Sequence, residues 1–224
     1  MNKTMIIDLL TAPNKYAEKY YQDVEIEDNK AIKDPTKQAL WKESKIAKML
    51  ETASSKAVTG RVASIGLAFY TASGWDYRLI TFREEKTILK ELNEYLNFHT
   101  IEGITSLHSK RMKEFTIPFL CRRYLANNIY NGLRDVDLMQ DLSQFLMAGK
   151  AYPSSQCQEN TSLEDDLFLI DQGSIVKTPF ITEKPSDLIE SYINLGDKAS
   201  EEAINSYMKY RIEGLAKYVE RSYK

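Results

Sequence analysis

The stretch TMIIDL (residues 4–9) is an apolar run with a single carboxylate, Asp8, inside it. A short run rich in apolar and β-branched residues predicts a buried β-strand, and Thr11-Ala12-Pro13-Asn14 after it predicts a turn. Residues 14–34 are polar and rich in tyrosine, which is typical of a surface loop. Asp34-Pro35 then predicts the N-cap and the first position of a helix that ends near residue 55.

The rest of the chain alternates between strand and helix patterns. Residues 62–70 and 75–82, joined by a turn at Ser73-Gly74, predict an antiparallel hairpin. Residues 84–96 predict an amphipathic helix, and residues 101–107 predict another strand. Further helices are expected at residues 118–127 (with Thr116 as N-cap), 138–146, 162–170, 186–195 and 200–223. This order predicts the α/β class, with a mixed sheet flanked by helices, in a single domain over residues 1–224.

Composition excludes several classes of protein. The 224 residues are 43% hydrophobic and carry a net charge of only −2, which excludes a wholly disordered chain. The longest uncharged run, residues 62–75, is shorter than the ~20 apolar residues that cross a bilayer. Residues 1–8 lack the apolar core of a signal peptide, so we expect synthesis in the cytoplasm and no membrane partner.

Common catalytic signatures are also missing. The two cysteines are too few for a disulfide framework, and the two histidines, His99 and His108, are too few for a zinc site built on several histidines. No Gly-x-Ser-x-Gly elbow, Walker A loop or Gly-x-Gly-x-x-Gly fingerprint occurs. The pI near 5.9 argues against a uniformly basic, nucleic-acid-binding surface. We therefore expect no cofactor and no small-molecule substrate.

Four segments in order resemble the motifs of one enzyme family. They are residues 6–13 (IIDLLTAP), 59–66 (TGRVASIG), 115–125 (FTIPFLCRRYL) and 207–212 (YMKYRI), with shorter matches at 137–139 (DLM) and 161–163 (TSL). Together they resemble DEDD-type 3′–5′ exonucleases of the branch related to the proofreading domain of family B DNA polymerases. The resemblance covers residues 5–218 and is strongest at 115–125. It implies an RNase H-like mixed sheet flanked by helices.

This family holds two divalent cations on four carboxylates, and the metals activate water and stabilise the reacting oxygens. The resemblance places the four ligand positions at Asp8, Leu10, Thr116 and Arg211. Three of the four carboxylates are therefore replaced, one of them by a cation. The resemblance thus implies that the site binds no metal and that the protein is not an enzyme. We hypothesise that Arg211 fills the former metal space and pairs with Asp8, because a carboxylate in a pocket needs a partner.

Two other groups of residues leave alternatives open. Basic residues near the second motif predict either a nucleic-acid patch or solvated surface charges, and the resemblance favours a structural role for the arginine pair. These residues are Lys110, Arg111, Lys113, Arg122 and Arg123. Tyrosine clusters predict either a partner surface or half-buried aromatics. They comprise Tyr16, Tyr20 and Tyr21, and also Tyr207, Tyr210, Tyr218 and Tyr223.

Three functions follow as hypotheses. The first is a non-catalytic structural or scaffolding protein whose partners are other protein subunits. Because this exonuclease branch is common in bacteria and phages, we expect a phage particle component (connector, ring or tail accessory) that enters the virion. The second is a degenerate nucleic-acid-binding protein that holds a single strand with Lys110, Arg111 and Arg211. The third is an active nuclease with rearranged ligands, Asp8 with Asp135, Asp137 or Glu213.

Overall fold

The computed structural model describes residues 4–101, 106–109, 112–130, 133, 139–141 and 185–222. Within these ranges, one five-stranded sheet has the order β3-β2-β1-β4-β5. The middle strand β1 (Thr4–Pro13) is antiparallel to β2 (Gly60–Thr71), which is antiparallel to β3 (Gly74–Thr81). On the other side, β4 (Ser106–Ser109) is parallel to β1, and β5 (Met139–Asp141) is parallel to β4. The predicted α/β class with a mixed sheet is confirmed.

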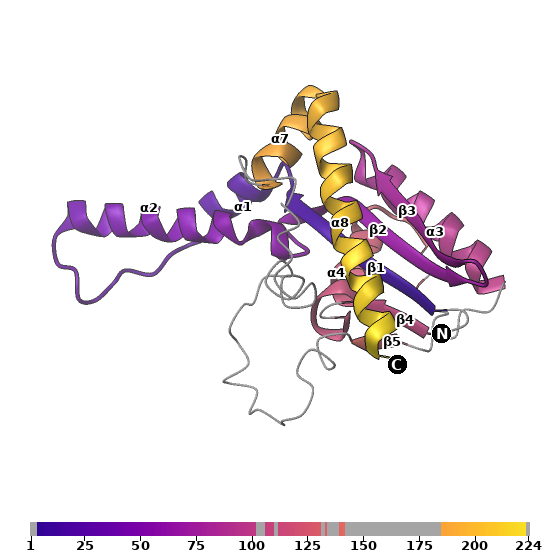
Figure 1. Ribbon diagram of the computed structural model, residues 1–224. Helices are drawn as coiled ribbons and strands as arrows, with labels where there is room; N and C mark the ends of the chain where they lie inside the picture. Colours follow the sequence, from indigo (N-terminus) through magenta and orange to yellow (C-terminus); the bar gives the residue numbers. More distant parts are fainter. Residues whose placement is uncertain are drawn as a thin grey trace.

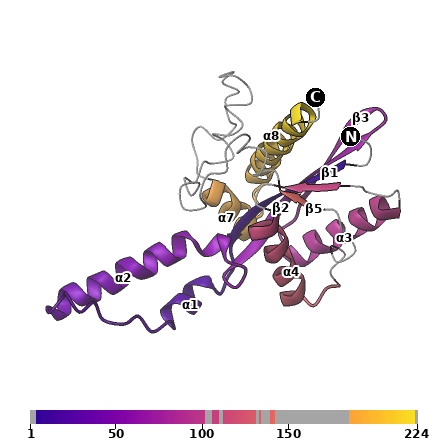
Figure 2. The ribbon, with the colours of Figure 1, turned by 90° about the horizontal axis from the view of Figure 1, so that it is seen from below.

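Helices cover both faces of this sheet (Figures 1 and 2). The helices α3 (Glu85–Ile101) and α4 (Ile117–Ala126) lie on one face, and α7 (Pro185–Leu195) and α8 (Lys198–Ser222) lie on the other. Side chains of a strand alternate between its two faces. The odd-numbered apolar residues of β1 accordingly pack in the core with α3 and α4, and the even-numbered ones pack with α7 and α8. In the described ranges, no helix combines the length and the apolar composition of a membrane span.

Several predicted elements are present with changed bounds. The helix predicted at residues 35–55 is α2 (Pro35–Glu51), followed by a 3-10 turn at Ala53–Ser55. The carboxylate of Asp34 accepts hydrogen bonds from the backbone N–H groups of Thr36 and Lys37, which confirms the predicted N-cap. The segment predicted as a loop contains a short helix, α1 (Ala17–Gln22). The turn predicted after β1 is wrong, because residues 11–13 continue the strand by pairing with residues 60–62.

The second half of the chain needs further corrections. The strand predicted at residues 101–107 begins only at Ser106, since α3 extends to Ile101. Thr116 does not cap α4 with its side chain, because residues 112–116 form a π-helical turn that continues into this helix. Residues 139–141 form β5 instead of part of the predicted helix 138–146. The remainder of that helix and the one predicted at 162–170 lie outside the described residues.

A buried ion pair fastens α3 to α4. Arg123 donates from Nε and Nη2 to the two carboxylate oxygens of Glu85, at 2.8 and 2.6 Å, and from Nη1 to the carbonyl oxygen of Ala57 at 2.9 Å. The backbone N–H of Val62 also donates to Glu85, at 2.7 Å. Both charged side chains are at most 10% exposed. Arg123 is therefore structural, whereas its neighbour Arg122 is exposed.

The helix α2 projects away from the sheet (Figure 1). We call residues 23–51 the arm: residues 23–34 run outward, and α2 returns toward the body. No residue of α2 is buried. Only its C-terminal part packs on the body, where Ile46, Met49 and Leu50 are half-buried against Ala17, Tyr21 and Ala53. Most of the arm is therefore available to a partner.

Replacing Glu85 by Gln should lower the free energy of unfolding by about 3–5 kcal/mol, because Arg123 would stay buried without its counterion. Urea denaturation of the purified chain measures this change. The matched control is Glu91→Gln on the same helix, since Glu91 only approaches Arg78 at 3.7 Å near the surface, and it should change stability by less than about 1 kcal/mol. Equal effects of the two substitutions would contradict the structural role of the buried pair.

Candidate functional site

Asp8 is a buried carboxylate in the middle strand of the sheet. Its residue is only 5% exposed, and it lies on the face of β1 that α7 and α8 cover. Its neighbours on that face are apolar: Ile6 packs with Ile212 and Leu10 packs with Ile189. An ionised carboxylate in such a layer is strongly unfavourable unless a cation and hydrogen bonds compensate it.

Arg211 of α8 supplies that compensation. Its Nε donates to Oδ2 of Asp8 at 2.6 Å, and its Nη2 donates to Oδ1 at 3.1 Å. This is the two-pronged geometry that makes arginine–carboxylate pairs strong. Tyr207, one turn earlier on α8, accepts a hydrogen bond from Nη1 at 3.2 Å, and its ring centre lies 5.3 Å from the guanidinium. The predicted pairing of Asp8 with Arg211 is confirmed.

The other two predicted ligand positions carry no carboxylate. Leu10 is on the same face of β1, two residues after Asp8, and is buried among apolar side chains of α7 and α8. Thr116, the last residue of the π-helical turn before α4, is buried, and its hydroxyl shares a hydrogen bond of 2.9 Å with the hydroxyl of Ser109 at the end of β4. The side chain of Leu10 has no donor atom, and the hydroxyl of Thr116 lacks the negative charge of a carboxylate ligand.

The site as built does not fit a pair of divalent cations. Magnesium prefers several hard oxygen ligands, and both oxygens of Asp8 already accept hydrogen bonds from Arg211. A guanidinium about 5 Å from a divalent cation would repel it by several kcal/mol, even at an effective dielectric of ~20. The chemistry that this arrangement supports is the neutralisation of one buried carboxylate, which holds α8 on β1.

Only some of the other residues that were predicted to bind a partner or a metal lie in the described part of the chain. Lys110, Arg111, Asp135 and Asp137 lie outside the described residues, and the side chain of Lys113 is not described either. Glu213 is half-exposed, at 3.9 Å from Lys209. Among the tyrosines, Tyr21 and Tyr207 are buried. Tyr16 and Tyr20 are exposed, so only this part of the first cluster is accessible to a partner.

His108 is a buried residue whose role was not predicted from the sequence. It lies in β4, where its Cα pairs with that of Ile6 in β1. Its Nε2 is 3.1 Å from the hydroxyl of Ser106, which in turn bonds the hydroxyl of Thr4 at 3.1 Å. Burial lowers the pKa of His108 to about 4. The imidazole is therefore neutral near pH 7 and belongs to a polar connection between the two parallel strands.

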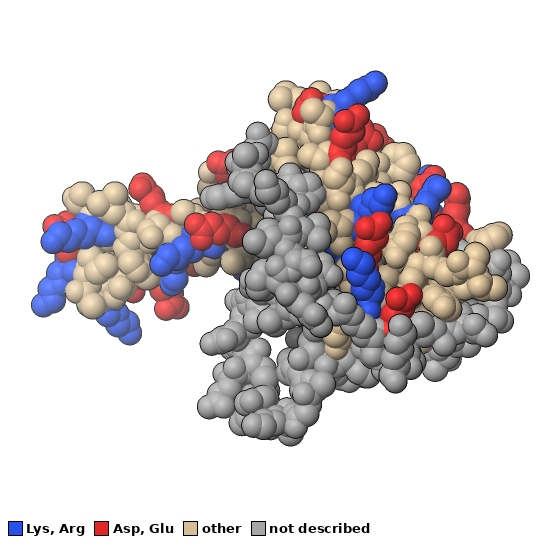
Figure 3. All heavy atoms as spheres, in the orientation of Figure 1, with Lys and Arg blue, Asp and Glu red and all other residues tan. Residues whose placement is uncertain are grey.

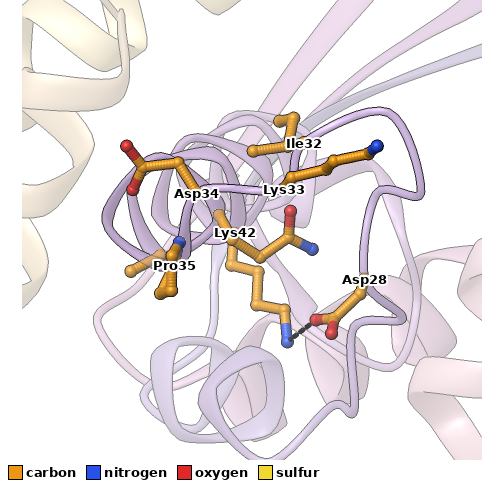
Figure 4. Close-up of a pocket in the computed structure, with 8 residues that line it drawn as sticks. Asp28, Ile32, Lys33, Asp34, Pro35 and Lys42 are labelled. Carbon is orange, nitrogen blue, oxygen red and sulfur yellow. Dashed lines mark ion pairs between the residues drawn. The ribbon is translucent and has the colours of Figure 1, made fainter.

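A shallow hollow lies on the arm, between α2 and the segment that precedes it (Figure 4). It is lined by Asp28, Ile32, Lys33, Asp34, Pro35, Gln38, Ala39 and Lys42. The Nζ of Lys42 is 2.6 Å from Oδ1 of Asp28, and this hydrogen bond lowers the pKa of the carboxylate. The pair links the outgoing segment of the arm to α2.

Replacing Arg211 by Met should lower the free energy of unfolding at neutral pH by about 3–5 kcal/mol, because Asp8 would be left as an unpaired buried charge. Adding Asp8→Asn should restore most of this loss, since the double variant buries no charge there. Chemical denaturation of the wild type, both single variants and the double variant gives the coupling. Additive losses would mean that the two side chains do not depend on each other.

Acidification should destabilise the protein through His108. Its folded-state pKa lies below the unfolded value of about 6.5, so the unfolded state binds the extra proton first and stability falls between about pH 6.5 and pH 4. The full loss from this group is roughly 3 kcal/mol. Denaturation curves across this pH range should show a smaller loss in His108→Gln than in the wild type. A slope in His108→Gln equal to that of the wild type would contradict this assignment.

Two comparisons with known proteins bear on the family resemblance. No protein-family model matches the chain. A search of the curated proteins also finds no match. The likeness to DEDD-type exonucleases therefore depends on the sequence segments quoted above.

Proposed function

We propose that this protein is a non-catalytic relative of the DEDD-type exonucleases, with an RNase H-like fold, that acts as a structural subunit of a larger protein assembly. The observation that carries the proposal is the Asp8–Arg211 ion pair. An arginine that binds the one remaining acidic ligand position with two hydrogen bonds serves the fold, and the same geometry opposes the binding of a catalytic metal.

The sheet topology supports the fold named in this proposal. Its strand order, with β2 antiparallel to the strand at the centre, is compatible with an RNase H-like fold. The resemblance also requires that the first and third motifs meet, although they lie at opposite ends of the chain. Asp8 and Arg211 are separated by 203 positions in the sequence and are in direct contact.

The arm supports a role in assembly. Most helices in proteins are stabilised mainly by packing an apolar face against the rest of the structure. No residue of α2 is buried, and Leu40, with Ala47 two turns later on the same face, is exposed. Packing of this face against another subunit would supply the missing burial. The placement of that assembly in a phage particle remains a prediction from the resemblance.

The two alternative functions have less support from the described residues. A nucleic-acid groove built on Arg211 would need a free cation, and this guanidinium is neutralised by Asp8. A rearranged nuclease would need the oxygens of Asp8, which Arg211 holds. The carboxylate of Glu213 lies 3.9 Å from the Nζ of Lys209. Its position is rotated by about 200° around α8 from that of Arg211, so the two side chains leave the helix in different directions.

A nuclease assay on end-labelled single- and double-stranded DNA tests the proposal. With Mg²⁺ or Mn²⁺ we expect no degradation by the wild type, because the site repels the metals. Asp8→Ala serves as the control for a contaminating nuclease, since it cannot restore a metal site. Metal-dependent degradation by the wild type that disappears in Asp8→Ala would contradict the proposal and establish an active enzyme.

A further inference from the structure

One side of α2 carries a row of basic residues around a tryptophan. Lys37, Trp41, Lys45 and Lys48 follow one another at spacings of four, four and three residues. At 100° per residue, these positions fall within an arc of about 80° on the helix. The three lysines are exposed, and Trp41 is half-buried. We call these four residues the basic face; it adjoins the face with Leu40.

The lysines of the basic face have no directly bound acidic partner in the described part of the protein. None of its three lysines forms an ion pair there. Lys42, in contrast, lies on another side of α2 and pairs with Asp28. The ammonium of Lys45 lies 4.5 Å from the ring centre of Trp41, so the cation and the aromatic ring form one surface.

The basic face is also accessible. Lys37, Lys45 and Lys48 are all exposed, and Figure 3 shows lysine side chains projecting from the arm, with acidic side chains among them. The axial distance from Lys37 to Lys48 is about 16 Å, from eleven steps of roughly 1.5 Å. A flexible polymer can follow such a row without a deep cleft, whereas a small ligand would find no enclosed site.

The combination of side chains indicates the chemistry of the partner. Lysines bind phosphates as point charges, and an aromatic ring stacks on an unpaired base. Lysine is depleted in protein–protein interfaces, so three lysines around one tryptophan favour nucleic acid over an acidic protein. A duplex keeps its bases stacked inside, and Trp41 could reach only a base that is already unpaired.

We propose that the basic face of α2 binds single-stranded nucleic acid without sequence preference, with Lys37, Lys45 and Lys48 on the phosphates and Trp41 stacked on a base. This binding goes beyond the proposed structural role and does not depend on the Asp8–Arg211 site. It also differs from the groove expected at Lys110, Arg111 and Arg211.

Fluorescence of Trp41 tests the stacking contact directly. The chain has two tryptophans, so Trp75→Phe leaves Trp41 as the only tryptophan, whose emission is excited selectively at a wavelength that the 14 tyrosines do not absorb. An oligothymidylate of about 12 nucleotides should quench this emission, and the binding of a labelled oligonucleotide by the wild type should confirm the affinity. Three phosphate contacts predict that log K falls against log salt with a slope of about −2.

Charge reversal identifies the surface involved. Lys37→Glu/Lys45→Glu should weaken binding at least tenfold, and Trp41→Ala should weaken it by about tenfold. The matched control Lys86→Glu/Lys90→Glu makes the same charge change at two exposed lysines of α3 and should leave the affinity unchanged. Circular dichroism checks that each variant is folded.

Three results would overturn the inference. The first is no binding by the wild type at low salt, and the second is equal weakening by the control variant. The third is equally tight binding of polyglutamate without quenching of Trp41, which would assign the basic face to an acidic protein surface. None of these results depends on the nuclease assay, so the inference and the proposed function can fail separately.

Discussion

A carboxylate in the apolar layer between a sheet and its covering helix must be neutralised, and Asp8 imposes this requirement on the whole molecule. Arg211 satisfies it with two hydrogen bonds, and Tyr207 supports the guanidinium from the preceding turn of α8. The contact fixes which side of α8 faces β1. An apolar stripe on this helix then packs against the sheet, through Ile204, Met208, Ile212, Leu215 and Val219. One polar contact thus joins the two ends of the chain.

On the face of the sheet that α3 and α4 cover, a second buried ion pair also neutralises a carboxylate. Glu85 and Arg123 are both buried, and their contacts join α3 and α4 to β2 and to the carbonyl of Ala57. Buried pairs of this kind add little net stability compared with apolar residues, but they penalise any other register, because a shift would leave a charge unpaired. In DEDD-type exonucleases, bound metal cations balance the negative charge of the acidic residues. In this protein, the guanidinium of Arg211 balances the negative charge of the buried Asp8 carboxylate.

Local sequence patterns correctly predicted the helices whose apolar residues recur at helical spacing, such as α3 and α8. They also predicted the hairpin of β2 and β3. They failed where distant pairing decides the structure. Residues 139–141 have a pattern compatible with a helix, yet they pair with β4, and residues 11–13 continue β1 because β2 lies beside them. The partner of Asp8 was predictable from the resemblance and from the chemistry of a buried carboxylate. The burial of His108 and the projection of α2 were not, since both depend on tertiary packing that no local pattern records.

The molecule consists of a body held together by buried ion pairs and an arm whose surface is accessible to partners. Asp8 is bound by Arg211, and we propose that it binds no metal. The most direct test is a crystal structure grown with Mn²⁺, with anomalous diffraction to locate the ion. We predict that the guanidinium of Arg211 remains within hydrogen-bond distance of both carboxylate oxygens, with no anomalous peak beside them. A manganese ion bound to Asp8, with Arg211 turned toward solvent, would contradict the account.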